Sequence, residues 1–311
     1  MARRPSPLQA QIAAVRALRT DFDAALAVPE LCEYLTASSN QLVAEAAMIC
    51  GEFGLLELQE DLVTAFRRLL IRPLKSDPTC VGKIAVAEAL VAMEAYQEPL
   101  YLQGVQHVQP EPVWGGRQDT AAKLRAVCML GLARTGHEHV LDRLADLLAD
   151  PEPDARIGAA RAAAYVTTAG ASALLRLRLQ IGDPEPAVTQ ACASALLTQQ
   201  PGALSLVAEH LINADLGQAE AAALAIGEAA PPGAFEVLSE AWSEAAEMRL
   251  RRTLLVALAM LRHPAALEFL LALPPLVDSR DLDDLIAAMN LYRHDHHVWQ
   301  RFEAALTQAG R

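Results

Sequence analysis

The sequence predicts an all-α fold in which paired helices stack one after another along the chain. Three observations predict it: Ala and Leu dominate the composition, no segment alternates cleanly between apolar and polar residues, and one motif recurs after 33 residues. The chain is 53% hydrophobic but only 5% aromatic. Ala and Leu enter helices at little cost, and Ala lets helix backbones approach closely. A chain of 311 residues exceeds one ordinary compact core, whereas a stacked repeat packs each unit only on its neighbours.

The recurring motif is a helix-opening turn. Segments 150–153 and 183–186 both read Asp-Pro-Glu-Pro, and an Ala-rich run, a break and a Leu-rich run follow each. Asp is a good N-cap and Pro is tolerated in a first helical turn. Similar turns at Asp77 and Asp119, with weaker capping signals elsewhere, extend the pattern. We therefore predict a single array over 1–311 of about nine helical hairpins, with caps at 1–36 and 280–311: 7–35, 40–71, 79–106, 120–149, 154–181, 186–213, 216–245, 247–273 and 280–309.

A basic residue recurs six positions after the turn residue. The pairs are Asp77/Lys83, Asp119/Arg125, Asp150/Arg156 and Ser243/Arg249. A constant offset places the basic residue on a constant face, where it can reach the neighbouring unit's turn carboxylate or carbonyls. We therefore predict a structural ladder formed by Asp119, Arg125, Asp150 and Arg156. Thr189 and Ala221 stand at this position after Asp183 and Asp215, so the ladder is expected to be interrupted there.

The best-defined unit resembles a HEAT repeat, and it is closest to the short bacterial subtype associated with bilin lyases. The resemblance rests on Asp150, Arg156 and Ile157 with the following Ala159-Ala160 and Ala173-Leu174-Leu175, and the motif's Asp and Arg also match Asp119 and Arg125. It is good over 119–214 and weaker outside. It implies a right-handed α-α superhelix with the second helix of each pair on the concave side. It implies a fold and no single function, because such arrays serve as scaffolds, adaptors, lyase subunits and occasional DNA glycosylases.

The charge distribution argues against a nucleic-acid ligand. The net charge is −12, and no Lys or Arg occurs from Leu179 to Met248. Sequence-independent binding of nucleic acid needs clustered basic residues. The acidic stretch is open to two interpretations, a solubilising face or a footprint for a protein with a basic surface. On the second interpretation, Glu209, Glu236 and Glu240 are candidate contact residues.

Segment 107–118 is longer than an ordinary turn between repeat helices. It reads His-Val-Gln-Pro-Glu-Pro-Val-Trp-Gly-Gly-Arg-Gln. Long solenoid loops are often functional, and Trp and Arg are typical interface anchors. Two interpretations compete: Trp114 folds back over a gap between units, or the loop contacts a partner. We expect the ring to be tucked in, with Glu111 and Arg117 at the rim as the partner contacts.

The remaining chemistry-bearing residues predict no catalytic, cofactor or metal site. Cys32, Cys50, Cys80, Cys128 and Cys192 form no Cys-x-x-Cys pair, so we expect free, buried thiols in a cytoplasmic protein. The cluster 293–299 holds three His and one Asp. It could bind a transition metal, but a solvated turn with Asp295 as N-cap is the expected arrangement. No apolar run reaches the length of a membrane span, so we expect no membrane association.

A non-catalytic protein–protein interaction scaffold accounts for these features together. The alternatives are a bilin-lyase-like subunit that handles a chromophore, which rests on the subtype resemblance, and a HEAT-like DNA glycosylase. A glycosylase would need a basic groove beside an extruded base, and the stretch without Lys or Arg disfavours it.

Overall fold

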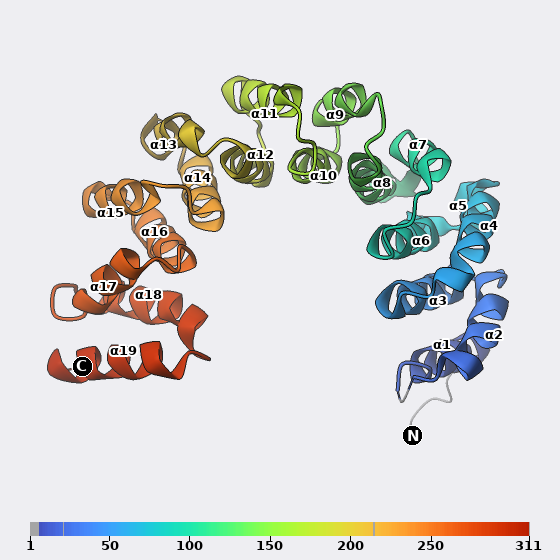
Figure 1. Cartoon of the computed structure of the whole chain (residues 1–311), viewed down its shortest axis with the longest axis horizontal. Coiled ribbons are helices and arrows are strands. Elements are labelled where there is room, and N and C mark those ends of the chain that lie inside the picture. The colour runs from blue at the N-terminus through green and yellow to red at the C-terminus, as the bar shows by residue number, and fades with distance from the viewer. Residues whose placement is uncertain (1–5, 21, 214, 311) are drawn as a thin grey trace. The chain divides into compact units, whose positions relative to one another are not determined.

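The computed structural model describes residues 6–20, 22–213 and 215–310 of the chain. The chain divides into two compact units, Met1–Val166 (unit 1) and Thr167–Arg311 (unit 2). In both units the helices follow one another in consecutive pairs (Figure 1). The described residues of unit 1 form ten α-helices, two 3₁₀ turns and one two-stranded sheet: α1 (Pro7–Ala17), α2 (Ala24–Leu35), α3 (Asn40–Phe53), η1 (Leu56–Leu58), α4 (Gln59–Leu70), α5 (Pro73–Ser76), η2 (Pro78–Cys80), α6 (Val81–Ala92), α7 (Glu98–Val105), β1 (Pro110–Val113), β2 (Gly116–Asp119), α8 (Ala122–Thr135), α9 (Val140–Leu148) and α10 (Pro153–Ala163).

Unit 2 consists of nine α-helices and two 3₁₀ turns in its described residues. They are α11 (Ala169–Ile181), α12 (Pro186–Gln199), η3 (Pro201–Ala203), α13 (Leu204–Asn213), α14 (Leu216–Ala229), α15 (Ala234–Glu244), α16 (Met248–Met260), α17 (Pro264–Ala272), α18 (Ser279–Met289), η4 (Asn290–Tyr292) and α19 (His296–Gln308).

These elements confirm the predicted architecture of paired helices. To within one residue, every α-helix of the described part lies in one of the nine predicted ranges, except the short helix α5. The predicted caps 1–36 and 280–311 contain α1 with α2 and α18 with α19, while residues 1–5, 21 and 311 of those ranges lie outside the described residues. One element class was not predicted, the small sheet of β1 and β2.

The Asp-Pro-Glu-Pro turns open helices in a different way from the one predicted. Asp150 and Asp183 stand two residues ahead of the N-caps, where each side chain accepts the backbone N–H of Glu152 or Glu185 at 2.9 Å. The second Pro of each motif occupies the first helical turn. The carboxylate thus closes an Asx turn, and the fixed φ of Pro starts the helix. The motif predicts the helix start correctly. The prediction that its Asp is the N-cap residue is wrong, because Glu152 and Glu185 occupy that position.

Small residues bring the first helices of consecutive pairs into close contact. A Cβ added to Gly51 on α3 would stand 2.8 Å from the Cα of Ala89 on α6, and one on Gly227 would stand 2.7 Å from the carbonyl oxygen of Ala257 on α16. A larger residue at either position would force the two helices apart, because no side-chain movement can relieve a clash with backbone. The Ala-rich composition therefore sets the distance between these helices.

This spacing decides which layer is the inner one within each unit. The first helices pack on one another, in the series α3, α6, α8, α10 in unit 1 and α12, α14, α16, α18 in unit 2, whereas successive second helices barely touch. The layer with the shorter helix-to-helix spacing lies inside a curve, so the first helices form the inner layer of each unit. The expectation that second helices line the concave side is therefore wrong. Its physical reason is that Ala and Gly occupy the first helices, while the Leu-rich second helices bury one face only.

Gly158→Ala should lower the free energy of unfolding by about 1–3 kcal/mol, the usual cost of overpacking. A Cβ on Gly158 of α10 would stand 2.1 Å from the Cβ of Ala126 and 2.5 Å from its Cα on α8, so the two helices would have to separate. Urea denaturation measures the change. Gly202→Ala is the control, because an added Cβ there meets nothing within 4 Å. Equal stability of Gly158→Ala and wild type would refute the close approach of α8 and α10.

The cysteines belong to the packed interior, with one exception. All five are free thiols; Cys50, Cys80, Cys128 and Cys192 are buried and Cys32 is half-buried. Burial raises the pKa of the Cys50 and Cys80 thiols to about 12. The prediction of buried free thiols is therefore confirmed for four cysteines and wrong for Cys32, whose Sγ lies 3.4 Å from a carboxylate oxygen of Asp61. Among the described helices, none is both long and apolar enough to cross a bilayer.

Candidate functional site

The segment after α7 is a β-hairpin. β1 and β2 pair antiparallel, with Glu111 opposite Gln118 and Val113 opposite Gly116, so Trp114 and Gly115 form the two-residue turn. Gly115 has φ +91°, a conformation that L side chains rarely adopt. Gly115 thus supplies the positive φ that the turn requires. The strand pairing was not anticipated, because Pro110 and Pro112 lack the N–H that a central strand needs; in a two-stranded ribbon their nitrogens can face outward.

Trp114 stands at the tip of this hairpin, in solvent. It is 103% exposed relative to a fully solvated residue. The expectation that its ring folds back over a gap between repeat units is therefore wrong. The physical reason is the tight turn, which directs the residues at its centre away from the helices. Val108 and Val113, before and within β1, are exposed as well.

Glu111 fastens the hairpin to the helices. Its Oε1 accepts the backbone N–H of Thr79 at 2.6 Å, the hydroxyl of Thr120 at 2.7 Å and the side-chain amide of Gln109 at 2.7 Å. Desolvation raises the pKa of Glu111, but these hydrogen bonds outweigh it and hold the pKa below its ordinary value. Glu111 is half-exposed, and its predicted role as a partner contact stays a prediction. Arg117 is exposed, and its Nη2 donates to the carbonyl of Pro110 at 3.0 Å.

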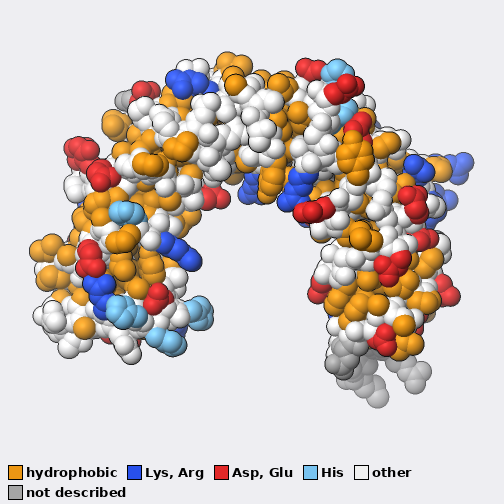
Figure 2. Space-filling model, in the orientation of Figure 1, with side chains coloured by type: hydrophobic (Ala, Val, Ile, Leu, Met, Phe, Trp, Pro, Cys, Tyr) orange, Lys and Arg blue, Asp and Glu red, His pale blue; other side chains and the backbone are white. Residues whose placement is uncertain are grey.

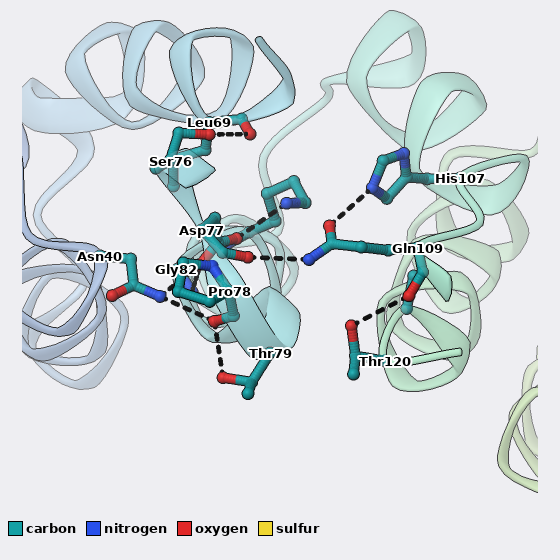
Figure 3. Close-up of polar contacts among 12 residues, drawn as sticks. Asn40, Leu69, Ser76, Asp77, Pro78, Thr79, Gly82, His107, Gln109 and Thr120 are labelled. Atoms are coloured by element: carbon teal, nitrogen blue, oxygen red, sulfur yellow. Dashed lines mark hydrogen bonds and ion pairs between the residues drawn. The ribbon is translucent and has the colours of Figure 1, made fainter. Parts of the chain in front are cut away.

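A buried ion pair lies beneath the hairpin (Figure 3). The Nζ of Lys83 donates to Oδ2 of Asp77 at 2.9 Å, and neither side chain is exposed to solvent. The other carboxylate oxygen of Asp77 accepts the backbone N–H of Gly82 at 2.8 Å and the side-chain amide of Asn40 at 2.9 Å. Gln109, just before β1, donates to the carbonyl of Asp77 at 2.8 Å. The hairpin is therefore tied to α3, η2 and α6 through one hydrogen-bonded network.

The turn that receives the hairpin has an unusual backbone. Thr79 and Cys80 have φ values of +62° and +58°, which side-chain-bearing residues rarely adopt. Such conformations persist where the surrounding structure enforces them. Here the N–H of Thr79 is held by Glu111, and the carbonyl of Pro78 accepts the side-chain amide of Asn40 at 2.9 Å. The hairpin is thus held in one orientation by groups on several elements.

Asn40 and Gln109 could not be identified from the sequence as members of this network. The hydrogen bonds that join them to Asp77 span 37 and 32 residues along the chain. No local pattern marks a polar residue whose partners are that distant. Only the fixed offset between Asp77 and Lys83 could be read from the sequence.

Arg125 joins two consecutive turns, as the ladder hypothesis requires. Its Nη1 donates to Oδ2 of Asp119 at 2.6 Å and to the carbonyl of His107 at 2.9 Å. Its Nε and Nη2 donate to the two carboxylate oxygens of Asp150 at 2.8 and 2.9 Å. Desolvation raises the pKa of Asp119, but backbone N–H groups and Arg125 outweigh it, so the pKa lies below its ordinary value. The guanidinium is itself buried, and it is held by four acceptor atoms on three residues.

Arginines also contact the next two turns. Arg156 donates through Nη1 to the carbonyls of Asp150 and Pro151 at 2.8 and 3.0 Å, so its contact with the Asp150 turn is through the backbone. At the following turn, Arg178 of α11 donates to the carboxylate of Asp183. Thr189, at the ladder position itself, is buried.

The predicted pairing of Ser243 with Arg249 is out of register. Helix α15 continues through Glu244, so the turn begins two residues later than predicted. Arg251 is therefore the ladder residue: it donates to the carbonyl of Ala245 at 3.4 Å and to Oδ2 of Asp281 at 2.6 Å. Arg249 lies on the surface and pairs with Glu220 at 2.8 Å.

A pocket of about 400 Å³ lies between the hairpin and the turn at α5. Leu74 and Val108 supply its apolar lining, and Arg72, Lys75 and Arg117 surround it with positive charge. Figure 2 shows Lys and Arg side chains protruding around α5. We call this region the hairpin surface and define it by its apolar and basic side chains: Leu74, Val108, Val113, Trp114, Arg72, Lys75 and Arg117.

The predicted acidic contacts lie on second helices of unit 2. Glu209 is exposed on α13, and Glu236 and Glu240 are exposed on one face of α15. Glu209 and Glu236 line different pockets, so the three residues do not form one site. Being on second helices, they belong to the outer layer of their unit.

The histidine cluster near the end of unit 2 is a helix start. The Asp295 side chain accepts the N–H of Val298 at 3.1 Å and caps α19, as expected. Within residues 6–20, 22–213 and 215–310, no group of three His, Cys, Asp or Glu side chains is placed to hold a metal ion.

Comparison with known proteins gives structural likenesses of low similarity. No family model matches the sequence, and no curated protein matches it. The complex of CpcE and CpcF of the phycocyanin lyase from Nostoc sp. PCC7120 contains a chain that is 17% identical, with a TM-score of 0.39 over 90% of this chain and 93% of that one. Human deoxyhypusine hydroxylase in complex with glycerol is 19% identical, with a TM-score of 0.33 over 83% and 92%. Because the TM-scores are this low, neither structure supports an inference about the activity, the ligand or the partner of this chain. Its own paired helices, and the Asp–Arg contacts between consecutive turns, show that it is a HEAT-like repeat protein in fold.

Proposed function

We propose that this chain is a non-catalytic protein-binding scaffold and that the hairpin surface is its docking element. The observation that carries the proposal is the complete exposure of Trp114 on a hairpin that is otherwise held firmly. An exposed Trp promotes nonspecific association, so a ring held in solvent on a fixed support suits a binding role better than a packing role.

The hydrogen bonds beneath the hairpin favour tight binding. Glu111, Gln109 and Asp119 hold both strands before any partner arrives. A preorganised anchor loses little conformational entropy on binding, and Trp and Arg are the residues most often found at the energetic centre of interfaces. Trp114 and Arg117 thus have both the support and the chemistry of anchor residues.

The hairpin surface also defines the partner's chemistry. Trp114, Val113 and Val108 would enter an apolar recess, and the basic groups of Arg72, Lys75 and Arg117 would face carboxylates at its rim. We therefore expect a protein partner with a hydrophobic pocket bordered by Asp or Glu. Glu236 and Glu240 are exposed acidic residues on α15, and we propose that they contact a second protein surface that is basic.

Trp114→Ala should weaken partner binding by about 2 kcal/mol or more, roughly 30-fold in affinity, and leave the melting temperature unchanged. The melting temperature should not move because the ring contacts no core. A photoreactive phenylalanine at position 114 would crosslink the partner in native lysate for identification. Titration of the purified partner with wild type and variant then measures the affinity.

Leu26→Ala is the matched control, since Leu26 is an exposed apolar residue of unit 1 outside the hairpin surface. It should bind the partner as wild type does. If Trp114→Ala and wild type bind the crosslinked partner equally well, the hairpin is not the docking element.

A further inference from the structure

The interruption of the ladder leaves a pocket in unit 2. It has a volume of about 430 Å³ and lies between the ends of α11 and α13 and the starts of α12 and α14. It contains no Lys or Arg, and its polar lining comes from Gln180, Asp183, Thr189, Glu209, His210, Asp215 and Gln218.

Unit 1 shows what normally occupies such a position. There Arg125, six residues after the turn residue Asp119, bridges the carboxylates of Asp119 and Asp150. In unit 2, Thr189 is likewise six residues after the turn residue Asp183, and Asp215 opens the next repeat. Both turn carboxylates are therefore kept, but the bridging guanidinium of the intervening helix is absent.

The hydroxyl oxygen of Thr189 is accessible from this pocket. Its side chain is buried, with a residue exposure of 4%, and it lines the pocket. In the part of the chain that the structure describes, its hydroxyl forms no hydrogen bond. Because the oxygen is open to the pocket, it is free to bond with whatever occupies the pocket. The hydroxyl can accept a hydrogen bond from a ligand that enters the pocket.

The charge of the pocket favours a cation. Arg178 forms an ion pair with the carboxylate of Asp183 and balances its charge. The side-chain amide of Gln218, which is uncharged, donates to the backbone carbonyl of Asp183 at 2.8 Å. Asp215 uses Oδ1 to cap α14, accepting the N–H of Gln218 at 3.0 Å. Its Oδ2 and the carboxylate of Glu209 are thus available as acceptors at the pocket.

We propose that this pocket binds a guanidinium group, which takes the place of the missing ladder arginine. The planar fork of a guanidinium donates to carboxylates in pairs and tolerates burial better than an ammonium does. It would donate to Asp215 and Glu209 and to the hydroxyl of Thr189, while the apolar stem of an arginine lies along Leu179. The ligand is either an arginine side chain of a bound protein or a free small guanidine. The site is separate from the hairpin surface, and the proposal does not depend on that surface being a docking element.

Isothermal titration of the full chain with Nα-acetyl-arginine N-methylamide tests the proposal. The citrulline analogue is the control ligand, because it has the same shape and no charge. We expect saturable binding of the arginine probe and at least tenfold weaker binding of the citrulline analogue. Agmatine, which lacks peptide groups, separates the two sources: tighter binding of agmatine favours a free guanidine, and tighter binding of the blocked arginine favours a protein side chain.

Three variants locate the binding. Asp215→Asn and Glu209→Gln should each weaken the arginine probe at least fivefold, and Asn preserves the helix cap. Thr189→Arg should abolish binding by restoring the ladder cation. Because this substitution is buried, circular dichroism is used to check that the variant folds. If it does not fold, Asp215→Asn and Glu209→Gln alone test whether the probe binds in this pocket. Glu228→Gln, an exposed acid of α14 outside the pocket, should bind as wild type. Absence of saturable binding, equal affinity for citrulline, or wild-type affinity in both Asp215→Asn and Glu209→Gln would overturn the proposal.

Discussion

Lys83→Met should lower the free energy of unfolding by about 3–5 kcal/mol, the usual cost of removing one partner from a buried ion pair. Met keeps the length of the side chain, so the change isolates the charge. It leaves the carboxylate of Asp77 buried, held only by neutral donors from Asn40, Gly82 and the backbone of residue 83. Chemical denaturation followed by circular dichroism measures the loss.

Two further variants identify the cause of that loss. Lys123→Met removes a lysine from an exposed pair with Glu88, in which the side chains are 60% and 41% exposed. It should change stability by about 0–1 kcal/mol. Combining Lys83→Met with Asp77→Asn should destabilise less than the sum of the single changes, because no unpaired charge then stays buried. If Lys83→Met proves as mild as Lys123→Met, the buried pair does not hold this part of the fold.

Arg125→Met should cost about 3–5 kcal/mol of stability as well, because it leaves two neighbouring carboxylates without their shared cation. Asp119 and Asp150 both contact this guanidinium, and the carbonyl of His107 would lose its donor. Arg125→Lys should fall between wild type and Arg125→Met, since an ammonium cannot reproduce the paired contact with Asp150.

The loss should depend on pH in a defined direction. The pKa of Asp119 is lowered in the folded protein, so its contribution to stability is present above its unfolded pKa, about 3.9, and is lost as pH falls through the lower folded pKa. Without Arg125 the folded pKa of Asp119 rises, so acid unfolding of the variant should begin at higher pH. Arg249→Met is the control, because Arg249 is exposed and lies outside the ladder. A variant at Arg125 that unfolds in acid at the wild-type pH would contradict the role of the guanidinium.

The sequence by itself determined the features whose causes lie within one helical hairpin. The Asp-Pro-Glu-Pro segments give the starts of α10 and α12 because Pro fixes φ in the first turn. The offset from Asp119 to Arg125 marks a ladder contact because six residues carry the chain from the turn onto a fixed face of the helix. The interruption at Thr189 follows from the same count.

The tertiary structure decided everything that depends on where distant segments meet. The choice between Arg249 and Arg251 as ladder residue depended on how far α15 continues, and its ladder contact with Asp281 spans 30 residues. Short Ala and Gly contacts between first helices put them on the inside of each unit, which no single helix reveals.

The candidate site shows the same division. The sequence marked 107–118 as exceptional through its length and its Trp and Arg, and this segment forms the hairpin, with Trp114 and Gly115 at its turn. Trp114 protrudes because the tight turn points away from the helices, and the orientation of that turn is held by two hydrogen bonds that each span 32 residues: the N–H of Thr79 donates to Glu111, and the side-chain amide of Gln109 donates to the carbonyl of Asp77. Residue identity and spacing specify local turns and periodic faces, whereas the direction of an exposed side chain follows from contacts that exist only after the helices have packed.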